Sequence, residues 1–187
     1  MEKIYTSFNI IMEMLRDRGI NVPDIQAGQI NSFIASQANK PGFEIVVGGN
    51  IRLVYYLANK FKWSELKKFF EDETSYELTI IIVKDKISQN NMKQLSALNI
   101  EMQTFLLKEL QFNISKHVLI PKHELIKDPQ EVKKIMEMYS LKNKHQFPII
   151  LKTDPMAKWL NLKSGDIIRI TRPSPTSGHY IVYRCCL

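Results

Sequence analysis

Residues 172–184 of this chain read Arg172-Pro173-Ser174-Pro175-Thr176-Ser177-Gly178-His179-Tyr180-Ile181-Val182-Tyr183-Arg184. A strand-like segment from Asp166 to Thr171 precedes them, and their second half is a strand-like stretch rich in β-branched and aromatic residues. Prolines, serines and a glycine between the two strands predict a loop with little backbone freedom. A rigid basic loop of this kind suits a docking surface. It holds no carboxylate and no nucleophile beside a base, so catalysis is not expected there.

The bulk composition is that of a folded protein, with 187 residues, 44% hydrophobic and 24% charged. This length fits one domain or two small ones. No stretch approaches the roughly 20 apolar residues of a membrane span, and the start lacks the pattern of a secretory signal. The two cysteines, Cys185 and Cys186, are adjacent and are not expected to bridge each other. An intracellular location without membrane contact is therefore expected.

The net charge of +7 is unevenly distributed along the chain. Residues 1–113 carry 13 basic and 13 acidic side chains, whereas residues 114–187 carry 13 basic and 6 acidic ones. The whole excess lies in the C-terminal part, where it favours a nucleic acid or an acidic protein surface as partner. A solvated surface that keeps the domain soluble is the alternative.

Residues 1–113 predict a small α/β domain. Helical spacing of Ile4, Phe8, Ile11 and Leu15 indicates a first helix, and Asp24 is expected to cap a second one with Ile30, Phe33 and Ile34 inward. Two strands, 43–47 and 51–57, flank a hairpin turn at 48–50. Ser64 and Ser88 are expected to cap helices, and the apolar run 78–83 reads as a strand covered on both faces. Residues 100–105 form the last expected strand.

Residues 114–187 predict a compact α+β module, joined stiffly to the first domain because no Gly/Ser-rich linker intervenes. A strand is expected at 117–120, ending at Pro121. Asp128 and Asp154 each precede a proline, which predicts two capped helix starts. Glu131 completes a capping-box pattern for the first of these helices, which is expected to run to about Ser140.

The sequence contains no pattern that predicts a catalytic, metal or cofactor site. His117 and His123 are separated by a proline break, and adjacent cysteines lack the spacing that binds zinc. Glu77 and Asp85 flank the buried strand 78–83, but the alternation of side chains places Asp85 and its neighbouring lysines on opposite sides. A working metal-dependent nuclease site is therefore not expected.

The C-terminal motifs resemble subunit 5 of multi-subunit DNA-dependent RNA polymerases and its shorter archaeal counterpart. The matching segments are His117–His123, Phe147-Pro148, Asp154–Trp159, Leu162–Asp166, Arg172–Ser174, Thr176, Gly178, Tyr180, Tyr183 and Arg184. Met12–Gly19 also looks like the first helix of the eukaryotic version. Because the archaeal proteins consist of the C-terminal module alone, the resemblance indicates the eukaryotic or viral type. Ile149, Ser164 and Pro175 depart from the family, since they stand where it usually has charged residues.

This resemblance implies a non-catalytic role and a fold of two parts. Residues 1–113 would form a nuclease-like domain without catalytic residues, part of the lower jaw that touches downstream DNA weakly. Residues 114–187 would be an assembly module that docks on the largest subunit, one copy per complex, without cofactor. The expected location is the nucleus for a cellular protein, and the host cytoplasm, in a viral factory or virion, for a viral one.

The residues expected to bind the partner lie in these motifs. They are Pro121, His123, Asp154, Pro155, Lys158, Trp159, Arg169, Arg172, Pro173, Ser174, Tyr180, Tyr183 and Arg184. Arg172 and Arg184 are the expected anchors, because a guanidinium binds a carboxylate through two hydrogen bonds. Tyr180 and Tyr183 are expected to face opposite sides of their strand. The alternative for both arginines is that they cap the module's own sheet or turn.

Two other functions remain open on the sequence. One is a stand-alone basic protein that binds nucleic acid, and the other is a degenerate nuclease-fold protein. Co-purification with very large polymerase subunits would distinguish a polymerase subunit from both.

Overall fold

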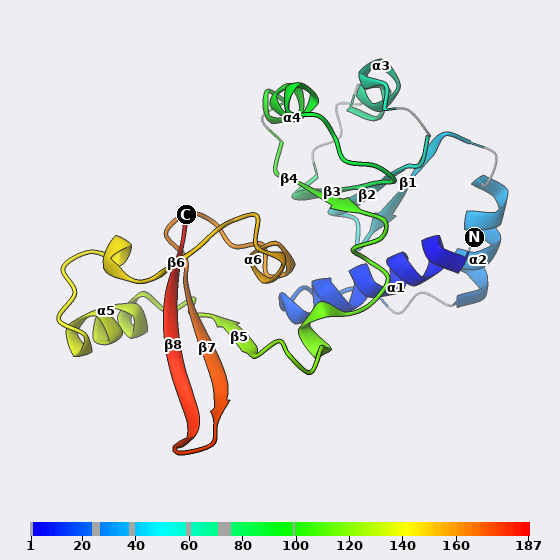
Figure 1. Ribbon diagram of the computed structural model, residues 1–187. Coiled ribbons are helices and arrows are strands. Elements are labelled where there is room, and N and C mark those ends of the chain that lie inside the picture. The colour runs from blue at the N-terminus through cyan, green and yellow to red at the C-terminus, as the bar shows by residue number, and fades with distance from the viewer. Residues whose placement is uncertain (1, 24–26, 38–39, 59–60, 71–75, 99) are drawn as a thin grey trace. The chain divides into compact units, whose positions relative to one another are not determined.

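The computed structural model describes residues 2–23, 27–37, 40–58, 61–70, 76–98 and 100–187 (Figure 1). The chain forms two compact units, Met1–Phe112 and Asn113–Leu187, called unit 1 and unit 2 below. The side chain of Asn113 accepts a hydrogen bond from the Ser115 backbone N–H at 2.9 Å and so caps the first short helix of unit 2. Each unit combines helices with a sheet, which confirms the expected mixed α/β class. In the described part of the chain, no helix has the length and apolar character needed to cross a membrane.

Unit 1 is built on a four-stranded sheet with strand order β1-β2-β3-β4. The strands are β1 (Gly42–Val47), β2 (Ile51–Tyr56), β3 (Leu78–Val83) and β4 (Met102–Leu106). The β1–β2 hairpin is antiparallel, and its turn requires positive φ at Gly48 and Gly49. β3 lies parallel to both β2 and β4 and is buried along its whole length. The expected strand covered on both faces is therefore confirmed.

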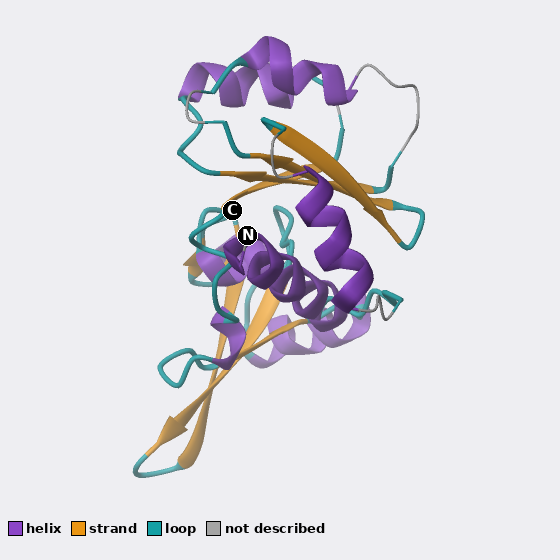
Figure 2. Ribbon diagram, turned by 90° about the vertical axis from the view of Figure 1, so that its right-hand side faces the viewer, coloured by secondary structure: helices purple, strands orange, loops and turns teal. Residues whose placement is uncertain are grey.

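Helices cover both faces of this sheet. On one side lie α3 (Trp63–Lys67), the 3₁₀ turn η1 (Lys68–Phe70) and α4 (Gln89–Ser96), which bury Leu66 and Leu95 against Val54 and Ile81. On the other side lie α1 (Glu2–Asp17) and α2 (Ala27–Gln37) (Figures 1 and 2). The nuclease-like character of this α/β unit remains a prediction.

Three details of unit 1 differ from expectation or lie outside the described residues. Ser64 does not cap α3: Lys62 occupies the N-cap position, and Ser64 is already in the first turn. Phe33 is mostly outside the core, although its ring meets that of Phe43 edge-on at 6.2 Å. The expected cap Asp24 lies outside the described residues. The Ser88 cap is confirmed, because its side chain accepts from the Asn91 N–H.

Unit 2 has a second four-stranded sheet, ordered β5-β7-β8-β6. Its strands are β5 (Lys122–Leu125), β6 (Ile149–Ile150), β7 (Ile167–Ser174) and β8 (Gly178–Cys186). The pairs β5–β7 and β7–β8 are antiparallel, whereas β6 runs parallel to β8. The remaining elements are η2 (Ile114–Lys116), α5 (Pro129–Met138), η3 (Lys144–Gln146) and α6 (Pro155–Trp159). Asp128 and Asp154 cap α5 and α6 as expected.

Three expectations for unit 2 are corrected. Residues 117–120 form a turn, and the strand begins only after Pro121. Glu131 does not complete a capping box, because its carboxylate instead pairs with Arg169 of β7. The loop within residues 172–184 is shorter than expected: β7 continues to Ser174 and β8 begins at Gly178, so the turn is confined to residues 175–177. The strand expected in the second half of this range is confirmed.

Candidate protein-docking surface

The two faces of the unit 2 sheet are covered by different helices. Ile168, Ile170 and Cys186 point toward α6 and pack with Ala157 and Leu162. Side chains of the opposite parity point toward α5, where Ile167, Cys185 and Tyr183 pack with Val132, Ile135 and Phe147. Because alternate residues of a strand point to opposite faces, the strand register assigns each expected partner-binding residue of the sheet to one of these sides.

Four of the expected residues share the α6 side. His123 is opposite Ile170, Arg184 is opposite Ile168, and Arg172 is opposite Tyr180, so all point the same way as the α6-packed core. The α6-side patch, as we call His123, Arg172, Tyr180 and Arg184, extends this face beyond its apolar part. Tyr180 is 59% exposed.

His123 shows that the charges of this patch act on one another. Its ring Nδ1 donates a hydrogen bond to the Pro121 carbonyl oxygen at 2.7 Å, which fixes the ring orientation. Burial lowers the pKa of His123; the Pro121 hydrogen bond and the Asp154 carboxylate oppose that shift, and Arg172 and Arg184 add to it. The Asp154 carboxylate and the two guanidinium groups are therefore close enough to the half-buried imidazole to influence its pKa. The fold thus brings together residues that are up to 61 positions apart in the sequence.

The α6 segment contributes one polar and one interior residue to this region. Asp154 accepts hydrogen bonds from the backbone N–H groups of Met156 (2.8 Å) and Ala157 (3.4 Å), so its carboxylate starts the helix. Trp159 is 2% exposed and lies in the interior, while α6 packs against η2. This corrects the expectation that Trp159 reaches a partner, because its side chain is enclosed within the protein. Pro155 is exposed and Lys158 is half-buried at the same helix.

The two expected anchors differ in their surroundings. Arg184 donates from Nη1 to the Ile149 carbonyl oxygen at 3.0 Å, and its Nε is buried without a hydrogen-bond partner among the described residues. The side chain of Arg172 is exposed. Arg184 therefore also has a role inside unit 2, whereas Arg172 presents its guanidinium to the outside.

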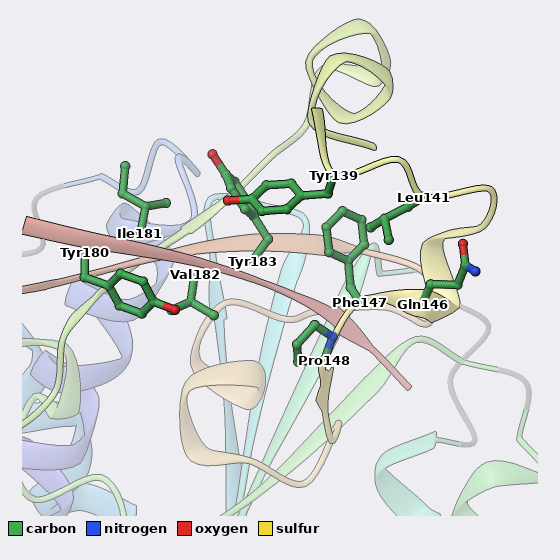
Figure 3. A pocket seen from close by; sticks show the side chains of 9 residues that line it. All are labelled: Tyr139, Leu141, Gln146, Phe147, Pro148, Tyr180, Ile181, Val182 and Tyr183. Atoms are coloured by element: carbon green, nitrogen blue, oxygen red, sulfur yellow. The ribbon is translucent and has the colours of Figure 1, made fainter. Parts of the chain in front are cut away.

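Arg169 and Tyr183 occupy the α5 side and are engaged within unit 2. The Arg169 guanidinium pairs with Glu131, lies 4.0 Å from the Glu124 carboxylate and sits 5.9 Å from the centre of the Tyr183 ring. The Tyr183 ring in turn meets that of Tyr139 edge-on at 5.8 Å. As expected, Tyr180 and Tyr183 face opposite sides, as Figure 3 also shows.

The hairpin end holds the last two expected residues. Pro173 is opposite His179 and points to the α5 side, and it lacks the N–H that a further strand would need. Ser174 Oγ lies 3.3 Å from Thr176 Oγ1 and accepts from the Ser177 N–H at 3.3 Å, so it shapes the turn. Pro173 and Ser174 therefore have a structural role at the end of the hairpin.

Sequence reasoning missed several exposed apolar side chains of unit 2. Val118 and Leu119 are 92% and 81% exposed on the turn before β5. Met138, Ile149 and Leu151 are also exposed. The β-branched character of residues 117–120 suggested a strand, and no local signal in the sequence separated exposed from buried apolar residues here. Such side chains are typical of surfaces that meet another protein.

The described residues of unit 1 do not bring the acidic side chains beside β3 together. Glu77 and Asp85 are both exposed and lie beyond opposite ends of β3. No group of three metal-binding side chains occurs among the described residues. Arg52 is a buried charge of this unit; it pairs with Glu44 and lies against the rings of Phe70 (5.7 Å) and Tyr76 (5.1 Å). This arrangement serves packing, because the guanidinium is already enclosed by its partners.

Unit 2 matches a known protein family, and the whole chain is similar to known proteins. Residues 112–186 match the family described as RNA polymerase Rpb5, C-terminal domain. The chain is 26% identical over 196 residues to DNA-directed RNA polymerases IV and V subunit 5B of Arabidopsis thaliana, which covers 98% of this chain and 89% of that relative. It is 31% identical over 130 residues to DNA-directed RNA polymerases I, II, and III subunit rpabc1 of Dictyostelium discoideum, which covers 66% of this chain and 65% of that relative.

Proposed function

This chain belongs to the RNA polymerase subunit 5 family, and we propose that it docks through unit 2 on the largest subunit of its polymerase. It is a non-catalytic subunit of a DNA-directed RNA polymerase. The observation that carries the docking proposal is the α6-side patch, where His123, Arg172 and Arg184 converge beside the exposed Tyr180.

The chemistry of this patch favours a protein partner with carboxylates. A guanidinium at an exposed position binds a carboxylate through two parallel hydrogen bonds, and a tyrosine beside it adds contact area with few rotatable bonds. Arg172 and Tyr180 are direct neighbours across the β7–β8 ladder, so they would act as one binding element. The basic excess of residues 114–187 would favour the same kind of partner over distance.

Unit 1 has a separate proposed role. It forms part of the lower jaw near downstream DNA. Its contact with that DNA is weak, because its 13 basic and 13 acidic side chains cancel. One copy per polymerase is proposed. The proposed location is the nucleus for a cellular polymerase, and the host cytoplasm or virion for a viral one.

The test is recovery of the largest subunit with a tagged full-length chain from cells that express the whole polymerase. Truncating a central interface arginine costs on the order of 2 kcal/mol, so Arg172→Glu is expected to reduce recovery at least about tenfold. Lys93→Glu, an exposed change of equal charge on α4, is the matched control. Equal recovery with Arg172→Glu and Lys93→Glu would remove the patch from the interface. A chain recovered alone, and bound to nucleic acid, would favour the stand-alone binding protein.

A further inference from the structure

The β7–β8 hairpin is longer than the strands that flank it (Figure 1). On its outer side, β7 is paired with β5 only from Ile168 to Thr171. On the other side, β8 is paired with β6 only at Cys185 and Cys186. From Gly178 to Arg184, β8 therefore has one edge that no strand of the described chain covers.

The backbone groups along this edge can be assigned from neighbouring hydrogen bonds. The Cys186 N–H donates to the Asp166 carbonyl on the β7 side, whereas the Cys185 N–H donates to the Pro148 carbonyl on the β6 side, both at 2.9 Å. Alternate residues of a strand direct their backbone groups to opposite edges. The N–H and C=O groups of Ile181 and Tyr183 consequently point, like those of Cys185, to the open edge.

The two edges of the hairpin differ in the residues that could block pairing with a further strand. Pro173 occupies an outward-facing position of β7 and removes the donor that a further strand would use there. The open edge of β8 carries neither proline nor lysine from Tyr180 to Tyr183; these four residues are uncharged and have high β propensity. Proteins usually protect such an edge, because it is a template for pairing. The edge of β8 is therefore suited to receive a strand.

A groove of about 280 Å³ follows this edge (Figure 3). Its lining comes from both faces of β8, with Tyr180 and Val182 on one side and Ile181 and Tyr183 on the other, so the groove wraps the strand edge itself. The far wall is formed by residues of the segment after α5. They are Tyr139, Leu141, Gln146, Phe147 and Pro148. The groove begins beside Pro148, the residue before β6, whose carbonyl oxygen accepts from the Cys185 N–H, and it continues the line of β6 along β8.

The carboxylates of Glu124 and Glu131 face Arg169 beside the lining residue Tyr183, whereas the segments that supply the groove walls are basic. Residues 138–153 and 167–187, which supply its walls, contain no aspartate or glutamate. In the first segment, the exposed Lys142 follows the lining residue Leu141, and the exposed Lys144, whose Nζ donates to the Gly165 carbonyl oxygen at 3.4 Å, lies two residues before the lining residue Gln146. Arg184 follows the β8 residues that line the groove. A segment with carboxylates at its ends would meet cations on both sides.

We propose that an acidic, extended segment of a partner protein adds to the open edge of β8 as a new strand. Its backbone pairs with the outward N–H and C=O groups of Ile181 and Tyr183. One apolar side chain enters the groove beside Tyr139 and Phe147, and flanking carboxylates meet Lys142 and Lys144. This mode of recognition takes affinity from main-chain hydrogen bonds and specificity from the side-chain pocket. The inference concerns the open edge of β8, which borders the α6-side patch at Tyr180 and Arg184, and it does not rest on the polymerase role.

The test starts from the chain alone. A display library of random 12-residue peptides is selected on the immobilised full-length chain, after depletion on the Ile181→Pro variant. The selected peptides are expected to be acidic, with β-branched or aromatic residues at alternate positions. In the complex, amide hydrogen exchange of Ile181 and Tyr183 is expected to slow at least about tenfold, while that of Val182, which faces β7, changes little.

Variants separate backbone pairing from charge. Ile181→Pro removes one outward N–H and is expected to weaken peptide binding at least tenfold, whereas Ile181→Val keeps that N–H and binding. Lys142→Glu with Lys144→Glu is expected to weaken binding at least tenfold, and Lys93→Glu with Lys108→Glu, the matched change on unit 1, to have no effect. The proposal is overturned by selected peptides without acidic residues, or by unprotected Ile181 and Tyr183 amides in the complex. A dimer in sedimentation that protects the same amides would also overturn it, because a second copy would then be the occupant.

Discussion

The guanidinium of Arg184 donates a hydrogen bond to the backbone carbonyl oxygen of Ile149, 3.0 Å away. Ile149 begins β6, a strand of two residues whose pairing with β8 covers only Cys185 and Cys186. Arg184 therefore ties this short strand to the hairpin from the side. Arg172, twelve positions earlier on the same face, is exposed.

The first prediction follows from this difference between the two arginines. Arg184→Met keeps most of the aliphatic stem but removes the charged donor, and a hydrogen bond to a charged group contributes about 1.5–3 kcal/mol. Removing the buried, unpartnered Nε offsets part of that loss, so the free energy of unfolding is expected to fall by about 1 kcal/mol. Arg172→Met is expected to change it by less than about 0.5 kcal/mol. Urea titration of both variants measures the two free energies of unfolding. An equal decrease in both variants would contradict a distinct role for Arg184.

The second prediction concerns pH. Because the fold lowers the pKa of His123, mainly through burial, the unfolded chain takes up a proton at a higher pH than the folded chain. The stability linked to His123 is therefore fully present above its ordinary pKa of about 6.5 and is lost as pH falls below that value. We expect the melting temperature to fall from pH 7 to pH 5, with a smaller fall in His123→Gln.

The control for this effect is His179→Gln at the exposed hairpin end. This variant is expected to keep the wild-type pH dependence, since the substitution leaves His123 and its surroundings intact. A His123→Gln protein whose melting temperature follows the wild-type curve would remove His123 as the source of the dependence.

The third prediction concerns the two thiols. Cys185 and Cys186 are fully buried on opposite faces of β8, and burial raises the pKa of both. Since the thiolate is the reactive form, we expect labelling by a disulfide reagent at pH 7.5 to be at least about 100-fold slower in the folded chain than in guanidinium chloride. Labelling at the same rate in both states would show that the end of β8 opens readily.

The fourth prediction is that residues 113–187 fold without unit 1. They contain their own sheet, two capped helices and two buried clusters, one on each face of the sheet. A single cooperative thermal transition is expected, followed by the fluorescence of the buried Trp159, the one tryptophan of this segment. A fragment beginning at residue 122 lacks η2, which packs against α6, and is expected to melt at a lower temperature. A non-cooperative transition of residues 113–187 would contradict independent folding.

Local signals in the sequence predicted the local features of this fold well. Ser88, Asp128 and Asp154 cap helices as expected, because a capping side chain bonds to N–H groups two or three residues away. The buried strand β3 was equally predictable, because an unbroken apolar run of six residues has to be covered on both faces of the sheet. Each of these features depends on a few neighbouring residues.

Features that depend on distant partners were not predictable in the same way. Residues 117–120 have the composition of a strand but form a turn, because the edge of β7 is occupied by residues 122–125 instead. The prolines of residues 172–175 suggested a loop, yet Pro173 fits in β7 at a position whose N–H would face outward. His123, Arg172 and Arg184 share one face of the sheet because of the strand register. The register cannot be predicted from a local sequence pattern.

The proposed docking of unit 2 on the largest polymerase subunit is tested most directly by photo-cross-linking from the α6-side patch. Tyr180, 59% exposed and opposite Arg172, is replaced by p-benzoylphenylalanine, a side chain of related shape, and the chain is assembled into the whole polymerase. Irradiation is expected to give an adduct between this chain and the largest subunit, and the adduct is expected to disappear when Arg172→Glu is added. An assembled polymerase in which position 180 links to nucleic acid or to another subunit, and never to the largest one, would contradict the account.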